Sequence, residues 1–291
     1  MSGNSTQPEL NFCTTIIANP DISGIGIRIS IYVGTIISLL LSLVMSDARN
    51  VAAINDIYQH TVFTSTGLII SAIIQWKTQG LSLFDGLIVT MLTSMMVGSS
   101  VVDAYKMHSV GLTGVFTHLL NATFTSYWGI QVWQNPSTFG IPLGGENCTA
   151  SVETIFVVFG KNVQVTNSKL RGFALFVFGW STTAIPMLLV GTILCVVAYA
   201  YVGLGGHEDP ADRGLAIGSQ YEEARPYKRF SSAKTSLAVI IYMIVTIEQM
   251  VHRNNVQAQL STWTFGQTLA LMVLLQQIMA AISLCKQESQ D

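Results

Sequence analysis

Uninterrupted apolar segments close to 20 residues long run along this chain, and they constrain its fold more than any other feature. A helix of about 20 residues crosses the ~30 Å hydrocarbon core of a bilayer. Only 10% of the 291 residues are charged, whereas soluble domains carry roughly a quarter. Most of the segments also lack the polar face that a helix on the surface of a soluble protein needs. The sequence therefore predicts an all-α, multi-pass membrane protein.

Seven such segments can be placed along the chain. They are Gly24–Met45, Ile57–Trp76, Leu83–Val102, Gly111–Trp133, Phe173–Tyr201, Ser236–Val251 and Trp263–Leu284. The second and sixth are the weakest, because they are short or bordered by His60, Glu248 and His252, and a re-entrant segment is the alternative there. The fifth is longer than a crossing needs, and Pro186 predicts a kink in it.

The seven transmembrane helices divide the chain into tails, spans and two long loops. The predicted parts are an outer N-terminal tail (1–23), spans one to four (24–133), an outer loop (134–170), span five (171–203), a cytosolic loop (204–233), spans six and seven (234–285) and a cytosolic tail (286–291). The outer loop contains T-I-F-V-V-F-G-K-N-V-Q-V-T-N, two β-rich runs around Gly160-Lys161-Asn162. This pattern predicts a small extracellular β-hairpin.

The distribution of basic residues sets the expected orientation. With the N-terminus outside, eight of the 14 Lys and Arg residues fall in cytosolic segments, and cytosolic loops carry the excess of positive charge in membrane proteins. We expect an outside or luminal N-terminus and a cytosolic C-terminus, in the endoplasmic reticulum or plasma membrane. A net charge of −2 gives no indication of nucleic-acid binding.

An outside N-terminus places Cys13 and Cys148 in an oxidising compartment. We expect a Cys13–Cys148 disulfide that ties the tail to the outer loop, with two unpaired thiols as the alternative. The sequons at Asn4 and Asn147 are predicted glycosylation sites, although a bonded Cys148 would compete with glycosylation of the adjacent Asn147.

Four spans place a polar residue at similar depth near their outer ends. These residues are Arg28, Asp85, Glu248 and Gln267. An ionisable group inside a bilayer costs a few kcal/mol and faces the bundle interior, where it finds a partner. We expect the Arg28 guanidinium to pair with the carboxylate of Asp85 or Glu248. A clamp that only fixes helix packing is the structural alternative to a functional site.

The functional interpretation is a polar pocket that opens outward. One carboxylate pairs with Arg28 and the other, Glu248 or Asp85, carries a proton. Tyr32 lies one turn deeper than Arg28, and it and Trp128 would form the walls of the pocket.

A second polar set lies near the inner face of the membrane. Asp56 and His60 are spaced i,i+4 and share a helix face. His118 lies near mid-membrane with Asn121 three residues later, and a neutral, hydrogen-bonded histidine is preferred there to a proton relay.

Several motifs of known membrane chemistry are missing from the sequence. The seventh span has no lysine for a retinal Schiff base, and no D-D-x-x-D motif is present to hold magnesium diphosphate. P-loop, H-E-x-x-H, G-x-S-x-G and C-x-x-C motifs are also absent. We therefore predict neither a metal nor a cofactor.

Two motifs resemble a group of fungal multi-pass membrane proteins. N-P-D-I-S-G-I-G-I-R-I-S-I-Y-V at Asn19–Val33 is similar to the N-x-D-I-x-G-I-G-x-R-I segment that opens their first span. W-T-F-G-Q-T-L-A-L at Trp263–Leu271 is similar to the W-x-F-G-Q start of their last span. The group is largely uncharacterised, so the resemblance implies a fungal seven-span architecture and no activity. Both motifs contain a member of the polar set, Arg28 or Gln267.

Three classes of function follow from these residues. The first is a membrane enzyme for a small lipophilic molecule, in its most concrete form a metal-free cyclase or isomerase of fungal specialised metabolism. In it the carboxylic acid of Glu248 or Asp85 protonates an olefin or epoxide. The second is an ion- or proton-coupled transporter or channel, which requires polar groups that continue through the membrane from Arg28 to His118 and to Asp56 and His60. The third is a membrane sensor that uses the two long loops.

Overall fold

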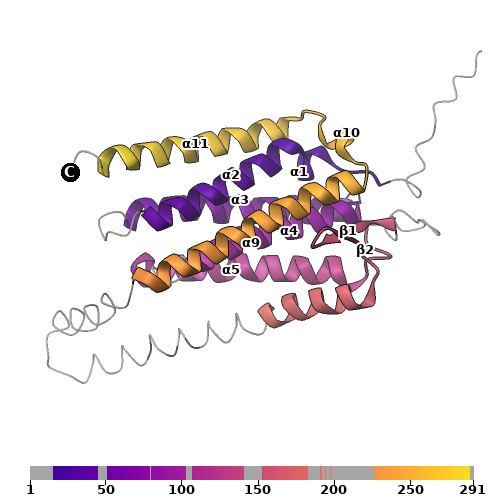
Figure 1. The fold of residues 1–291 in the computed structure, drawn as a ribbon, viewed down its shortest axis with the longest axis horizontal. Coiled ribbons are helices and arrows are strands. Elements are labelled where there is room, and N and C mark those ends of the chain that lie inside the picture. The colour runs from indigo at the N-terminus through magenta and orange to yellow at the C-terminus, as the bar shows by residue number, and fades with distance from the viewer. Residues whose placement is uncertain are drawn as a thin grey trace, which may run out of the picture.

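The computed structural model describes residues 16–44, 51–78, 80–102, 107–140, 153–182, 191, 194, 197 and 226–288. Long helices dominate, and they lie side by side along the longest axis of the molecule (Figure 1). They are α2 (Ile25–Val44), α3 (Val51–Thr78), α4 (Leu83–Val102), α5 (Met107–Gln134), α9 (Pro226–Arg253) and α11 (Phe265–Glu288). Two single-turn helices, α1 (Pro20–Ser23) and α10 (Gln257–Leu260), precede α2 and α11.

Three helical segments of the described chain are long and apolar enough to cross a membrane. They are Pro20–Leu41, Lys234–Arg253 and Phe265–Lys286. The apolar part of α4, Leu83–Ser99, is shorter. The all-α architecture and the membrane-spanning character are therefore supported, whereas seven crossings stay a prediction.

The helices extend beyond the apolar segments that predicted them. The bounds of α4 coincide with the expected span, but α3 and α9 are continuous helices of 28 residues each. Helix α9 begins at Pro226, ten residues before the apolar segment at Ser236. Proline suits a first helical turn, where no intrahelical partner awaits its missing N–H. A helix need not end where its apolar sequence ends, because its polar turns can continue into water.

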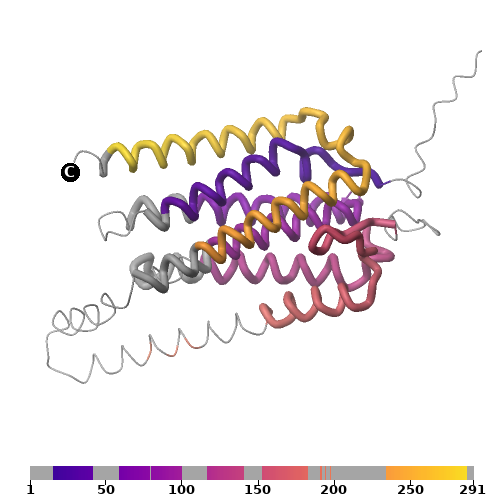
Figure 2. Tube along the Cα trace, in the orientation of Figure 1, coloured from indigo at the N-terminus to yellow at the C-terminus, as the bar shows by residue number. Residues whose placement is uncertain are grey.

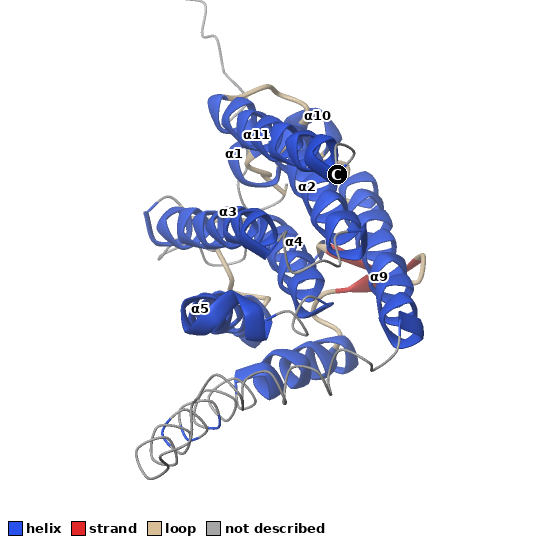
Figure 3. Cartoon of the chain, turned by 90° about the vertical axis from the view of Figure 1, so that its left-hand side faces the viewer, coloured by secondary structure: helices blue, strands red, loops and turns tan. Residues whose placement is uncertain are grey.

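Helix α11 packs on the outside of the bundle against α2, as the end-on view in Figure 3 shows. Only 11% of its apolar window is buried, against 61% for the window that contains α2. The first and last long helices are thus neighbours (Figure 2). They run in the same direction, because Gly26 faces Gln267 and Gly34 faces Gln277 farther along both helices.

The predicted hairpin is confirmed as strands β1 (Ile155–Val158) and β2 (Lys161–Gln164), which pair antiparallel. Its turn is Phe159-Gly160, where φ is positive at both residues, 48° and 78°. Two consecutive positive φ values define the turn that matches the twist of a two-stranded ribbon. The turn thus lies one residue earlier than predicted, because Lys161 and Asn162 pair with Val158 and Val157 in the ladder.

Amide and aromatic contacts hold the hairpin along the last three turns of α9. Asn254 accepts from the backbone N–H of Ile155 and donates to its carbonyl oxygen, both over 2.9 Å. At the tip, the Phe159 ring lies 5.0 Å from the Tyr242 ring. We call the end of the bundle that carries α1, α10 and the base of the hairpin the hairpin end.

Part of the predicted architecture lies outside the described residues. Of the fifth span, a helix over 168–182 is described. The predicted disulfide of Cys13 and Cys148, the sequons at Asn4 and Asn147, and the kink at Pro186 all fall outside. These stay predictions.

Candidate functional site

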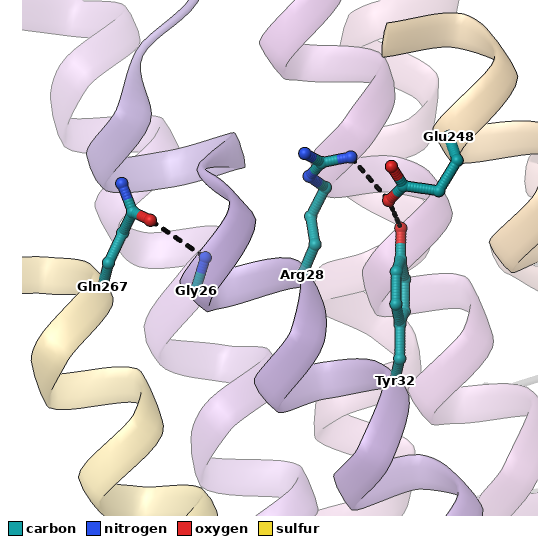
Figure 4. Close-up of polar contacts among 5 residues, drawn as sticks. All are labelled: Gly26, Arg28, Tyr32, Glu248 and Gln267. Atoms are coloured by element: carbon teal, nitrogen blue, oxygen red, sulfur yellow. Dashed lines mark hydrogen bonds and ion pairs between the residues drawn. The ribbon is translucent and has the colours of Figure 1, made fainter. Parts of the chain in front are cut away.

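Arg28 on α2 pairs with Glu248 on α9, near the hairpin end (Figure 4). The Nη1 atom of Arg28 lies 2.5 Å from Oε1 of Glu248. Tyr32, one turn farther along α2, donates its hydroxyl to the same oxygen over 2.9 Å. Of the two carboxylates considered from the sequence, Glu248 is thus the partner of the arginine.

The two members of this ion pair differ in their exposure. The Arg28 side chain is 3% exposed and that of Glu248 is 49% exposed. The Nε atom of Arg28 is buried and has no hydrogen-bond partner. Figure 4 shows Arg28 and Tyr32 converging on one carboxylate oxygen of Glu248. One carboxylate oxygen of Glu248 thus holds both the arginine and the tyrosine, on a side chain that is half exposed.

Asp85 belongs to a different network, where it fixes the start of α4 to the N-terminal segment. Its carboxylate accepts from the hydroxyls of Ser23 (2.5 Å) and Ser82 (2.7 Å) and from the backbone N–H of Asn19 (3.0 Å). Ser82 accepts in turn from the backbone N–H of Asp85 over 3.1 Å, which caps the first turn of α4. At 1% exposure, Asp85 is buried and well supplied with donors, and this arrangement suits a structural role.

Gln267 is buried completely and joins α11 to α2. Its Oε1 accepts from the backbone N–H of Gly26 over 2.9 Å, and its Nε2 donates to the carbonyl oxygen of Thr262 over 2.7 Å. A Cβ at Gly26 would lie 2.8 Å from Cβ of Gln267. Gln267 therefore positions the two helices, and the absence of a side chain at residue 26 permits the close approach.

Sequence reasoning missed the stripe of small residues on α2 that receives α11. Small residues recur every four positions along this face, at Gly26, Ser30, Gly34 and Ser38. Small residues at this spacing let two membrane helices approach closely. The spacing is readable in the sequence, and it predicts a close helix contact on this face of α2, although not which helix makes it.

Trp128 on α5 lies in an aromatic cluster and not against the Arg28 pair. It is fully buried, and its ring meets Trp76 and Phe139 edge-on at 6.2 Å and 6.1 Å. Its Nε1 donates to the carbonyl oxygen of Gly86 over 3.2 Å. These contacts fix α3, α4 and α5 together.

A small cavity lies deeper in the bundle, between α2, α3, α4 and α11. Its volume is about 20 Å³. Its polar lining residues are Ser30, Thr35, Thr61, Thr64 and Gln277. Thr35 is 2% exposed, and its hydroxyl has no hydrogen-bond partner. Sequence reasoning singled out none of these hydroxyl groups, although threonines three residues apart in an apolar span, such as Thr61 and Thr64, share a helix face.

Of the deeper titratable residues, His60 precedes Thr61, a residue that lines this cavity. Thr64 donates its hydroxyl to the backbone carbonyl oxygen of His60, one turn away on α3, over 2.8 Å. His118 on α5 is 8% exposed, and Oδ1 of Asn121 on the same helix is buried without a partner. The side chain of Asp56 lies outside the described part.

Within the described residues, no three His, Cys, Asp or Glu side chains gather as a metal site. The resemblance to fungal seven-span proteins rests on the residues at both ends of the chain. No family model, no curated protein and no solved structure matches this chain.

Proposed function

We propose that this protein conducts protons across a membrane, as a channel or as a proton-coupled transporter. One observation carries the proposal: polar side chains continue from the ion pair near the hairpin end into the middle of the bundle. Buried polar groups in membrane spans are costly and mark ion pathways and proton relays.

The half-exposed carboxylate of Glu248 is the entry point of the proposed pathway. A proton that binds to Glu248 neutralises its charge and weakens its attraction for Arg28, and loss of the proton restores the pair. Tyr32 adds a hydroxyl to the same carboxylate oxygen. The three groups form a site that takes up and releases one proton with a change in local pairing.

The pathway continues along α2 and α3. Thr35 follows Tyr32 by one turn on the same side of α2, and its hydroxyl borders the cavity. Thr64 lines the cavity from α3 and is bonded to the backbone of His60 on the next turn. The proposed route thus begins at Glu248 and continues through the hydroxyl groups of Tyr32, Thr35 and Thr64, with His60 one turn from Thr64 on α3.

The proposed architecture is seven spans with the hairpin end outside. In a chain that crosses seven times, the first and last spans run in the same direction, as α2 and α11 do. The partners are then the lipid bilayer and the transported proton. We also propose that the outer tail and loop are joined by the Cys13–Cys148 disulfide.

The cyclase or isomerase interpretation draws no support from the cavity described above. A pocket for a drug-sized lipophilic molecule needs several hundred Å³, whereas the cavity described above has about 20 Å³. Neither Glu248 nor Asp85 lines that cavity. The acid of that mechanism would also have to be released from its partners, Arg28 for Glu248 and two serines for Asp85.

Proton flux into liposomes tests the proposal. The purified protein is reconstituted with a trapped pH-sensitive dye, and a potassium gradient with valinomycin sets a negative internal potential. We expect internal acidification faster than in empty liposomes, and a drop of about tenfold in the Glu248→Gln variant, because an amide cannot carry the proton.

The matched control is Glu153→Gln, the same substitution at an exposed glutamate before β1, which should conduct like wild type. Wild-type flux equal to that of empty liposomes, or undiminished flux in Glu248→Gln, contradicts the proposal. A new organic-extract product in cells with wild type, lost in Glu248→Gln cells, would instead favour the enzyme.

A further inference from the structure

We propose that the cavity between α2, α3, α4 and α11 is a binding site for one water molecule. The binding site stands on the geometry of the cavity. Its use as a station in proton transfer rests on the function proposed above.

The size of the cavity selects a single small guest. One water molecule needs roughly 10–15 Å³ measured in this way, and the cavity offers about 20 Å³. A sodium or potassium ion with its shell of water molecules does not fit into this space. The residues that line the cavity are all uncharged, so a bare cation would have no countercharge there.

The hydroxyl groups around the cavity present unused hydrogen-bonding capacity. Ser30 donates to the carbonyl oxygen of Ile27 over 2.9 Å, and Thr64 donates to that of His60 over 2.8 Å. Their protons are thus engaged, and their oxygens remain able to accept. The Thr35 hydroxyl is buried without a partner and can donate or accept. Gln277 adds an amide with both donors and an acceptor.

This set matches the requirements of water. A buried water molecule typically makes about three hydrogen bonds to groups that are otherwise unsatisfied. It can accept from Thr35 or Gln277 and donate to Ser30 or Thr64. The hydrocarbon of a bilayer supplies no bulk water, so a buried hydroxyl without a bound water molecule is left with its hydrogen bonding unmet.

A bound water molecule also makes the route specific for protons. It accepts a proton on a lone pair and releases one of its original protons to the next acceptor. One O–H bond forms and another breaks, and the site returns to neutral water with no gain or loss of atoms. Alkali cations cannot move by this exchange, so the cavity separates protons from sodium and potassium.

Radiolytic footprinting of the full-length wild-type protein tests the site, and two neighbouring methionines serve as its internal control. X-ray pulses produce hydroxyl radicals from water, including bound water, and the radicals oxidise adjacent methionine sulfur. Met96 lines the cavity, and Met95 does not. The two are equally buried, at 2% and 1% exposure. We expect sulfoxide to form at Met96 at least about fivefold faster than at Met95.

Variants at Thr35 test whether the oxidation of Met96 depends on water bound in the cavity. Thr35→Val keeps the shape and removes the unpartnered hydroxyl, so Met96 oxidation should fall to the rate of Met95. Thr35→Ser keeps the hydroxyl and should retain the labelling. Equal oxidation of Met95 and Met96 in wild type overturns the proposal, and so does undiminished Met96 labelling in Thr35→Val.

The footprinting experiment tests the water site and the flux assay tests the proposed function, so either proposal can be overturned without the other. Selective labelling of Met96 without proton flux leaves the water site standing and removes the proposed function. Proton flux without selective labelling supports conduction and overturns the water site.

Discussion

In the described structure, polar groups near the hairpin end of the bundle have partners except for the Nε atom of Arg28, whereas several polar groups in the middle have none. Near the hairpin end, Asp85 and Gln267 are each engaged by more than one described group. In the middle, five residues carry a buried polar atom with no partner in the described structure: Thr35, Ser65, Ser94, Asn121 and Thr125.

The contrast extends to hydroxyl groups that could satisfy themselves. A serine or threonine in a helix can donate to the carbonyl oxygen three or four residues earlier. Thr93 on α4 and Thr64 on α3 do so over 2.8 Å, so a hydroxyl in the middle of the bundle can find this partner, whereas Thr35 and Ser65 do not. An unpartnered group in the interior costs roughly 1–3 kcal/mol. We infer that the polar groups at the hairpin end stabilise the structure and that the unpartnered hydroxyl groups in the middle are available to bind a small molecule such as water.

The largest effect is expected at Asp85, the centre of the partnered region. Asp85→Ala leaves two hydroxyls and a backbone N–H without their acceptor and should lower the free energy of unfolding by about 3 kcal/mol. The melting temperature in detergent, followed by size-exclusion chromatography after heating, measures it. Asp21→Ala is the control, because exposed Asp21 accepts only a 3.3 Å contact from Gly266 among the contacts between helices. Equal losses in the two variants would contradict a structural role for Asp85.

A smaller and asymmetric effect is expected at the ion pair. Glu248→Leu leaves the buried Arg28 guanidinium without a countercharge and should cost about 2–3 kcal/mol. Arg28→Leu leaves a half-exposed carboxylate and should cost only about 1 kcal/mol. The double variant should recover part of the loss, because no charge is then left unpaired. The same melting assay measures all three, and equal losses in the single variants would show that exposure does not govern the pair.

The sequence predicted the elements of this fold better than their contacts. Apolar length located the helices, and β-rich runs around a glycine located the hairpin, because both signals are local. The end of an apolar segment does not mark the end of a helix: the apolar span of α9, Lys234–Arg253, lies close to the predicted one, but the helix begins at Pro226. The number of crossings is not established by the described helices.

For the site, the sequence supplied the residues but not the pairing. Arg28, Asp85 and Glu248 have similar depth, and the choice between the two carboxylates depends on how α2, α4 and α9 pack. The serine three residues before Asp85 is a local capping signal, and it favours a structural Asp85. The cavity depends on four helices that meet in space, so no local pattern predicts it.

The smallest expected effect comes from a matched pair of serine-to-alanine substitutions. They remove the same hydroxyl oxygen near the hairpin end and in the middle of the bundle, and so compare the two regions directly. Ser23 and Ser65 are both fully buried. Ser23 donates to Asp85 over 2.5 Å, and the Ser65 hydroxyl has no partner. Ser23→Ala should cost about 1–2 kcal/mol, because it removes a hydrogen bond to a charged group.

Ser65→Ala should change the free energy of unfolding by less than about 0.5 kcal/mol, or raise it, since an unpaired hydroxyl in an apolar interior stabilises nothing. The melting temperatures of the two variants, measured side by side, check the difference. If Ser65→Ala were as costly as Ser23→Ala, the middle of the bundle would be held by polar contacts as firmly as the hairpin end. The hydroxyl groups there would then stabilise the fold and would not be free to bind a water molecule.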